Sequence, residues 1–261
     1  MSMARVLSQP RSLAEQRREL SREGAILARI VPLETAVAFG CALVAGIQWW
    51  THRPTAPWLI AAGICALFAG GHAWKILEDR RQAERVRLGA SGESRVAAVL
   101  RDHLDDRYVV FNDVVIAGGR ERAQVDHLVL GPTGVIVLET KNWAGTLSGQ
   151  AAGAIWTLAV PDGRTIRLSN PILQNQFHCQ VIRLRLEAAG LGTVPIQSWI
   201  VFASPNVSVQ VGSPPPGVEL LKLSELSSRC AAVQVQPSVI GAPQLERLIG
   251  CFRDAASAPS H

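Results

Sequence analysis

Residues 124–143 read QVDHLVLGPTGVIVLETKNW, in which two apolar runs flank four turn-forming residues. The runs 125–130 and 135–140 have the length and the β-branched content of strands. Gly131-Pro132-Thr133-Gly134 between them is typical of a tight turn. The stretch therefore predicts an antiparallel β-hairpin, and this hairpin sets the centre of the expected fold.

The register of this hairpin places four polar side chains near one another. A symmetric loop of two or four residues puts Asp126 opposite Glu139 and Gln124 opposite Lys141. Directly opposed Cβ atoms lie roughly 5 Å apart. Glu139 and Lys141 are two residues apart and share a face of the strand. The sequence thus predicts two acids, one lysine and one amide at the open end of an apolar hairpin.

Packing alone does not explain such a cluster, because opposed like charges destabilise a sheet and raise the pKa of one carboxyl group. Mg²⁺ or Mn²⁺ between the carboxylates removes both costs, and hard cations take carboxylate oxygens, waters and substrate phosphates. A lysine beside the cation can stabilise phosphate charge or position an attacking water. The alternative is that Lys141 only neutralises one acid at a solvated strand end.

Two nearly uncharged segments precede the hairpin and raise the mean hydropathy of the 261 residues to +0.18. They span residues 35–48, extendable to 30–50, and 58–74, and tryptophans lie at their ends as in the aromatic belt of membrane proteins. The short loop 51–57 separates them. We expect a transmembrane helical hairpin contacting the lipid bilayer; the alternatives are a buried soluble hairpin or a cleaved signal segment. About 30 mostly polar residues before the first span argue against the signal.

The basic residues flank this hairpin on both sides. Residues 1–30 hold six arginines against three acids, and residues 75–87 hold five basic against three acidic residues. Positive residues favour the cytoplasmic side, so we expect two spans in the inner (cytoplasmic) membrane with both termini cytoplasmic. Residues 88–261 hold 14 basic and 14 acidic residues. The net charge of +5 therefore indicates membrane-surface attraction and is no evidence for nucleic acid. Five cysteines without paired spacing fit a reducing compartment.

The rest of the chain predicts alternating helices and strands. Ser91 is the expected N-cap of a helix over 94–104, with Glu93 in its first turn, and Asn170-Pro171 is the expected start of a helix ending near Gly190. Strands are expected at 108–116, 156–160, 165–168, 196–203 and 218–223, a loop at 204–217, helices at 224–232 and 243–255, and a disordered tail after 255. This order predicts an α/β fold whose mixed central sheet is flanked by helices.

Four short motifs follow one another in a recognisable order. They are Gly89-x-x-Gly92-Glu93, Gln124-Val-Asp126-His127, Gly134-Val-x-Val-x-Glu139-Thr140-Lys141 and Asn170-Pro171-x-x-Gln174, with Trp143 and Gly145 after the lysine. Together they resemble the NERD (nuclease-related) domain of the PD-(D/E)xK nuclease superfamily. The resemblance implies a restriction-endonuclease-like domain over 89–203. From the sequence pattern we expect a basic segment 1–30, a membrane hairpin 31–77 and a linker 78–88 before that domain, and a C-terminal extension 204–261 that packs on it.

The resemblance also implies roles for individual residues. Asp126 and Glu139, with the main-chain carbonyl of Thr140, would bind Mg²⁺ or Mn²⁺, Lys141 would be catalytic, Glu93 would complete the acidic site and Gln174 would support it. His127, on the opposite face of its strand, is expected to be structural, and His178 a polar residue on a helix face with substrate contact as an alternative.

The implied function is a membrane-anchored, metal-dependent nuclease, with DNA the expected partner. Two alternatives remain at this point. The first is a non-catalytic membrane-tethered module that binds nucleic acid or protein, which the zero net charge of 88–261 favours because a DNA groove needs lysine and arginine. The second is a structural membrane protein in which Asp126, Glu139 and Lys141 form a buried ion network.

Overall fold

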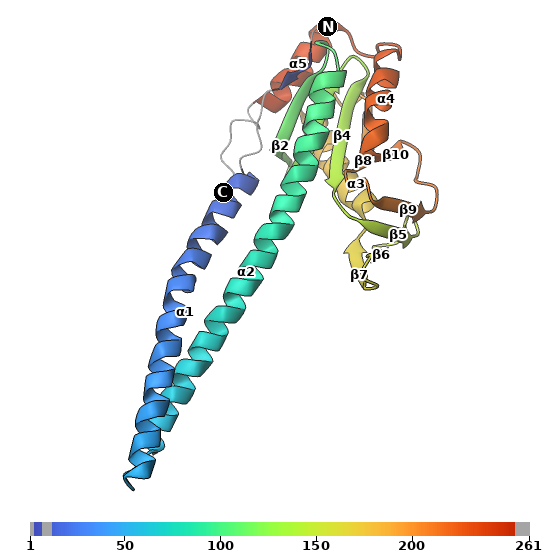
Figure 1. The fold of residues 1–261 in the computed structure, drawn as a ribbon. Helices are drawn as coiled ribbons and strands as arrows, with labels where there is room; N and C mark the ends of the chain where they lie inside the picture. Colours follow the sequence, from blue (N-terminus) through green and yellow to red (C-terminus); the bar gives the residue numbers. More distant parts are fainter. Residues whose placement is uncertain (1–2, 7–11, 254–261) are drawn as a thin grey trace. The chain divides into compact units, whose positions relative to one another are not determined.

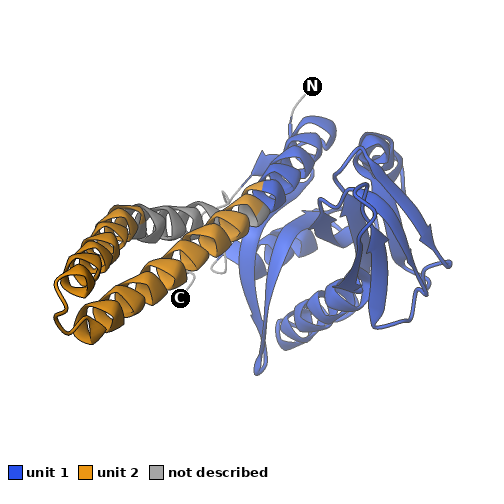
Figure 2. Cartoon of the chain, turned by 60° about the horizontal axis from the view of Figure 1, so that its bottom comes forward, with its two compact units in different colours: residues 1–12, 88–261 blue, residues 13–87 orange. Residues whose placement is uncertain are grey.

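A computed structural model describes residues 3–6 and 12–253, and the chain forms two compact units (Figure 2). One unit comprises residues 13–87, and the other comprises residues 1–12 and 88–261. The tail for which disorder was predicted lies outside the described residues. Each unit has its own physical character, and the candidate site lies within the second.

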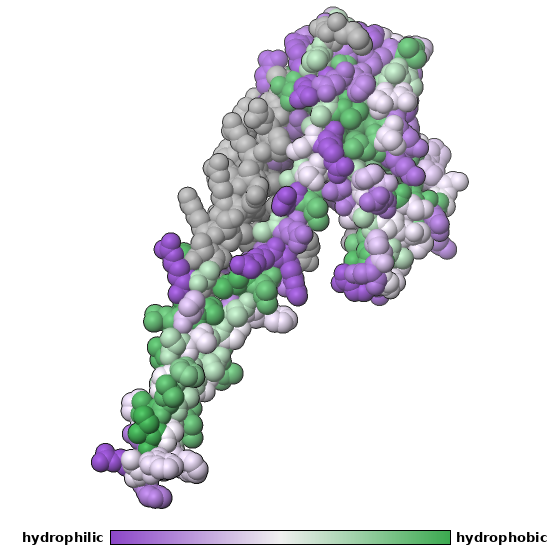
Figure 3. Space-filling model, in the orientation of Figure 1, coloured by the Kyte–Doolittle hydropathy of each residue, from purple (hydrophilic) through white to green (hydrophobic). Residues whose placement is uncertain are grey.

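The first unit is a helical hairpin made of α1 (Ser12–Trp50) and the first part of α2 (Ala56–His103) (Figure 1). Both helices are long and apolar enough to cross a membrane by length and composition, yet only 6% of each apolar window is buried within the structure. Trp50 and Leu67 are each about four-fifths exposed, at 82% and 78%, and apolar side chains gather along the hairpin (Figure 3). An interior helix of a soluble protein would bury such side chains, so the buried-hairpin alternative does not fit the described residues.

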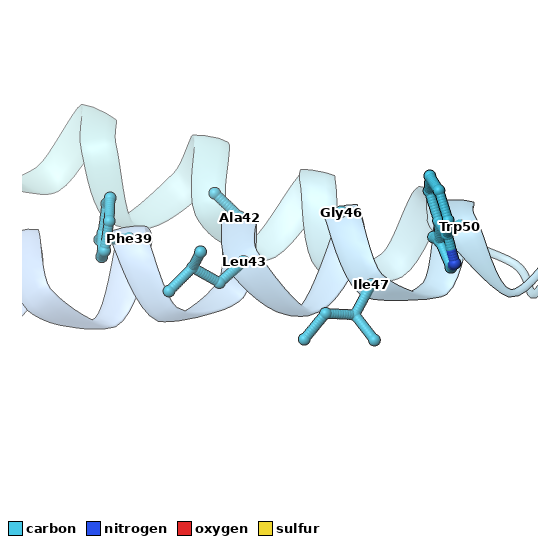
Figure 4. Close-up of a pocket in the computed structure, with 6 residues that line it drawn as sticks. All are labelled: Phe39, Ala42, Leu43, Gly46, Ile47 and Trp50. Atoms are coloured by element: carbon cyan, nitrogen blue, oxygen red, sulfur yellow. The ribbon is translucent and has the colours of Figure 1, made fainter.

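A polar contact joins the two helices of the hairpin. Glu34 Oε2 of α1 lies 2.9 Å from His72 Nδ1 of α2, and both side chains are partly buried. A shallow apolar hollow of about 470 Å³ lies farther along α1, where Ala42 and Gly46 leave space between larger side chains (Figure 4). Its lining holds no acid, base or nucleophile, so this hollow is not a candidate catalytic site.

Helix α2 continues without a break from the hairpin to His103. The predicted helix start at Ser91 is therefore wrong: the Ser91 hydroxyl donates to the Leu88 carbonyl at 2.9 Å inside the helix. Glu93 consequently lies far from a helix N-terminus, and the helix dipole does not account for it. Gly89 and Gly92 do not end the helix because a glycine costs a helix interior only about 1 kcal/mol.

The second unit contains a six-stranded sheet in the order β1-β2-β3-β4-β8-β10. Strand β3 is antiparallel to both of its neighbours, β2 and β4, whereas β1, β8 and β10 join the sheet in parallel. This arrangement confirms the predicted mixed sheet. The strand bounds are Arg5–Val6 (β1), Val109–Gly118 (β2), Glu121–Gly131 (β3), Gly134–Lys141 (β4), Ile196–Phe202 (β8) and Val218–Lys222 (β10).

The register of the central hairpin follows the prediction along most of its length. Gly131 pairs with Gly134 around a two-residue loop, and the pairs continue in step to His127 and Leu138. The predicted pairs Asp126–Glu139 and Gln124–Lys141 are absent, because the β3–β4 pairs among the described residues end at His127 and Leu138. The Gln124 amide instead donates to Asp113 Oδ1 at 2.6 Å.

Helices cover both faces of the six-stranded sheet, as predicted. Helices α3 (Pro171–Ala188) and α5 (Ala242–Arg253) pack on one face, with Val181 and Leu248 in its core. The last turns of α2 and helix α4 (Leu223–Gln234) pack on the other face, with Leu100 and Leu226 fully buried. These two layers explain why β3 and β4 are apolar on both faces.

A second sheet has the order β7-β6-β5-β9 and packs Leu147 and Trp156 against Ile200 and Phe202 of β8. Its strands are Gly145–Gly149 (β5), Ile155–Ala159 (β6), Thr165–Ser169 (β7) and Val207–Val211 (β9). The β6–β7 hairpin confirms the prediction. Strand β5 was not predicted, and β9 corrects the predicted loop over 204–217. The two strands pair with each other in parallel, and β5 also pairs with β6 in antiparallel.

Two glycines of α2 provide a matched test of how closely this helix must approach β4. A Cβ at Gly92 would lie 2.9 Å from the Asn142 Cβ, whereas a Cβ at Gly89 would meet nothing within 4 Å. We expect Gly89→Ala to stabilise the protein by up to about 1 kcal/mol through helix propensity. Gly92→Ala gains the same propensity but incurs an overpacking cost of about 1–3 kcal/mol. Thermal unfolding of both full-length variants in detergent measures the difference, and equal stabilities would contradict the close approach.

Candidate active site

Three sequence-distant segments meet at the ends of β3 and β4. Lys141 Nζ lies 2.6 Å from Glu139 Oε1 and donates to Gln174 Oε1 of α3 at 3.0 Å. The Thr140 N–H donates to Asp126 Oδ2 at 2.8 Å. The structure therefore brings together Asp126, Glu139, Thr140, Lys141 and Gln174, as the sequence predicts.

An irregularity in β2 and β3 accompanies the position of Asp126. Asp113 has a left-handed backbone conformation, φ 51°, and the pair that it would form with Asp126 is missing from the β2–β3 ladder. Phe111 and Val114, on either side of it, both pack in the same core although they are three residues apart. The alternation of side chains thus shifts by one residue here, which takes Asp126 out of the apolar pattern of its strand.

Asp113 is a fourth acid of this region that the sequence analysis did not single out. Its charge is the second cause, after burial, of the raised pKa of Glu93, and it also acts on His127. The signal was present in the sequence, because Asn112-Asp113 interrupts an otherwise apolar strand. Asp and Asn are also the residues that most readily adopt the left-handed conformation apart from glycine.

Burial and mutual repulsion raise the pKa values of the two strand carboxyl groups. Burial is the largest cause for Asp126, whose pKa lies well above its usual value, followed by the charges of Glu139 and Glu93. Burial also raises the pKa of Glu139, against the opposing effect of Lys141. The single ammonium group therefore does not balance the acids around it, and the site carries excess negative charge when both carboxyl groups are ionised.

Glu93 faces the same region from α2. Asn142 holds this part of the helix beside the end of β4, since its amide donates to the Leu88 carbonyl at 2.7 Å and its Oδ1 accepts from Arg95 at 3.0 Å. Burial, then the charges of Asp113 and Glu139, raise the pKa of Glu93 to about 7. The predicted nearness of Glu93 to the acidic site is thus seen as electrostatic coupling to Glu139.

The raised pKa of Glu93 predicts a pH-dependent stability. The folded-state pKa of Glu93, about 7, exceeds the unfolded value of 4.5. The stability that its protonated carboxyl group contributes is therefore fully present below about pH 4.5 and is lost as the pH rises through 7. We expect Glu93→Gln to stabilise the metal-free protein by about 1–3 kcal/mol at pH 8 and by little at pH 4, with solvent screening allowed for.

Thermal unfolding in chelator across this pH range measures the effect. Glu121→Gln, at an exposed acid of β3, is the control and should leave the pH profile unchanged. A Glu93→Gln profile parallel to that of the wild type would contradict the coupling.

Helix α3 fixes the far side of the site from its first turn. The Asn170 side chain accepts the Ile172 N–H at 2.8 Å and Pro171 begins the helix, which confirms the predicted start. Gln174 follows in the next turn and reaches Lys141. The lysine is also held near aromatic surface, because its Nζ lies 5.5 Å from the Trp143 ring centroid.

The two histidines near the site differ in their surroundings. His127 is buried, its Nδ1 lies 2.7 Å from Asn112 Oδ1, and burial lowers its pKa to about 3, which agrees with a structural residue. His178, predicted as a polar residue on a helix face, is also buried, and its Nδ1 lies 3.5 Å from Glu139 Oε2. Burial, then Lys141, lower the pKa of His178 to about 4, so its imidazole is neutral at pH 7.

The donor set fits a hard divalent cation in its chemistry. Asp126 and Glu139 place two carboxyl groups around Thr140, and their raised pKa values are the expected result of crowded carboxylates without a cation. Among the described residues, no three His, Cys, Asp or Glu side chains already converge as a complete metal site. Two carboxylates, a main-chain carbonyl and waters are therefore the ligands that this region can offer.

Comparison with known proteins places this region in a family. Residues 88–203 match the family model described as the nuclease-related domain, NERD. An uncharacterized protein of Bacillus anthracis is 35% identical over 101 residues, which are 38% of this chain and 47% of that protein. The matched segment thus spans about half the length of that relative. No solved structure matches the chain.

Proposed function

We propose, from the premise that residues 88–203 are a NERD domain of the PD-(D/E)xK superfamily, that the protein is a membrane-anchored, divalent-metal-dependent nuclease. It hydrolyses phosphodiester bonds, with DNA the expected substrate, and its domain has a restriction-endonuclease-like fold. The observation that carries the proposal is the convergence of Asp126, Glu139 and Lys141. Lys141 Nζ touches Glu139, and the N–H of Thr140 between them holds Asp126.

Asp126, Glu139 and the Thr140 carbonyl would hold Mg²⁺ or Mn²⁺, with Glu93 adding negative charge from α2. When bound, such a cation lowers the pKa of a coordinated water and polarises the phosphoryl oxygen. Asp126 is oriented by the Thr140 N–H, which leaves its other oxygen free of this contact. The bound cation would offset the mutual repulsion of the Asp126 and Glu139 carboxylates.

Lys141 is the residue of this chain that would face the reacting phosphate. Its ammonium group is held between Glu139 and Gln174, and only about a fifth of the side chain, 18%, is exposed. A cation fixed in a largely buried site stabilises the negative charge that develops on the phosphoryl oxygens without having to reorganise. Gln174 acts through Lys141 by restricting the position of its Nζ.

The membrane part of the proposal rests on the exposed apolar surface of the helical hairpin and on its basic flanks. A bilayer covers such surface, and the arginine-rich flanks favour a cytoplasmic location for both termini and the nuclease domain. Extraction of membranes with alkaline carbonate tests the anchoring: the full-length chain should stay in the pellet. Its release into the supernatant would contradict two membrane spans.

Cleavage of plasmid and linear DNA by the full-length protein in detergent, with Mn²⁺ or with chelator, tests the catalytic part. We expect cleavage with the metal and none with chelator. The second candidate, a non-catalytic tethered binding module, is favoured by the zero net charge of residues 88–261. Nucleic-acid binding without cleavage, in a protein that takes up Mn²⁺, would select that candidate.

A further inference from the structure

Two buried polar atoms at the site face each other without a hydrogen bond. Glu139 Oε2 and His178 Nδ1 lie 3.5 Å apart, and their side chains are only 2% and 7% exposed. In the part of the chain that the structure describes, neither atom has a hydrogen-bond partner. Buried polar groups are nearly always bonded, because an unsatisfied group costs about 1–3 kcal/mol. The two atoms are therefore each other's available partners.

The positions of both side chains are fixed by independent contacts. The other oxygen of Glu139, Oε1, is already occupied by Lys141 at 2.6 Å. Helix α3 is anchored to the sheet by the buried Asn175, whose amide donates to the Val137 carbonyl and to the Ser198 hydroxyl, both at 2.9 Å. His178 follows one turn after Gln174 on the same helix face. One helix therefore presents an amide to the lysine and an imidazole to the glutamate.

We infer that His178 is a positioning residue for the site, and this inference rests on the proposed function. Its Nδ1–H donates to Glu139 Oε2 in the metal-bound protein and thereby orients the carboxylate, so that Oε1 is the oxygen directed to Lys141 and the cation. Carboxylates that bind metals are commonly held by such outer hydrogen bonds.

Two substitutions of His178 test whether its ring acts as a hydrogen-bond donor. His178→Asn keeps an N–H donor near the position of Nδ1, whereas His178→Leu keeps bulk without a donor. Gln176→Leu, at an exposed position of α3, is the matched control. Calorimetric titration of the full-length protein in detergent with Mn²⁺ and with Mg²⁺ gives the dissociation constants. We expect His178→Leu to weaken both about 10–100-fold, and His178→Asn and Gln176→Leu to bind close to wild type.

Three results would overturn the inference. His178→Leu binding both ions as tightly as the wild type would show that the imidazole does not orient Glu139. A second result would be that His178→Asn binds both ions as weakly as His178→Leu, and that both variants lose a preference of the wild type for Mn²⁺ over Mg²⁺. This result would identify His178 as a direct nitrogen ligand instead. A wild type that binds neither ion removes the proposed function together with this inference, whereas the first two results leave the function standing. Should His178→Leu fail to fold, His178→Ala carries the same expectation.

Discussion

Asp126→Ala and Lys141→Ala should each reduce metal-dependent DNA cleavage by at least about 100–1,000-fold while the domain stays folded. Asp126 supplies one of the two strand carboxylates, and Lys141 supplies the ammonium group. The Thr140 N–H holds Asp126, and Lys141 Nζ lies 2.6 Å from the other carboxylate, Glu139. Residues that act as one unit are not additive. The double variant should therefore cleave DNA only slightly more slowly than the less active of the two single variants.

The fold should survive the loss of Lys141 for a specific reason. The variant leaves Glu139 without its counterion, but burial already raises the pKa of this carboxyl group, so that it can take up a proton instead of remaining an unpaired buried charge. Lys222→Ala, at an exposed lysine of β10, is the control and should cleave like the wild type. Cleavage is followed on plasmid DNA with Mn²⁺, and folding by circular dichroism. Full activity in a folded double variant would refute the assignment of both residues.

Asp126→Asn should reverse the effect of metal on stability. In chelator the free energy of unfolding of the variant should exceed that of the wild type by about 1–3 kcal/mol, because the variant removes a buried carboxyl group beside Glu139 and Glu93. The variant should therefore unfold at a higher temperature. The asparagine carbonyl can still accept the Thr140 N–H. With Mn²⁺ at about 100 times the dissociation constant, the wild type should gain about 2.7 kcal/mol. The variant should gain much less, so that the order of stabilities inverts.

Thermal unfolding of the full-length proteins with chelator and with Mn²⁺ measures this inversion. The sign follows from linkage: a carboxyl group whose pKa is raised on folding destabilises the folded state, relative to a neutral side chain, at every pH above its unfolded-state pKa, which includes neutral pH. Asp106→Asn, at an exposed acid before β2, should change neither condition. A wild type that is more stable than Asp126→Asn even in chelator would contradict the repulsion among the acids.

The central hairpin and α3 could be predicted because their signals are local. The turn residues 131–134 fix the register of β3 and β4, and Asn170-Pro171 fixes the start of α3. These two elements carry five of the six predicted site residues. The family resemblance also came from these local motifs, and the family match over residues 88–203 confirms it.

The remaining features depend on contacts between distant segments. Strand β9 joins its sheet by pairing with β5 across about 60 residues of chain, while β5 pairs with β6 as well. The close approach of α2 to Asn142 at Gly92 depends on where the end of β4 lies, which the two glycines alone do not reveal. Asp113 joins the acids only because the β2–β3 ladder skips one pair. The burial of His178 likewise depends on where α3 rests on the sheet.

Strands β3 and β4 carry Asp126, Glu139 and Lys141, and both have neighbouring strands on each side in the sheet order. Amide protons of such inner strands exchange with solvent mainly through global unfolding, whereas those of an edge strand such as β10 exchange through local opening. Fraying at the margins of the sheet would therefore leave the reactive groups in place. Catalytic competence should disappear together with the whole cooperative unit, rather than erode gradually as the periphery loosens.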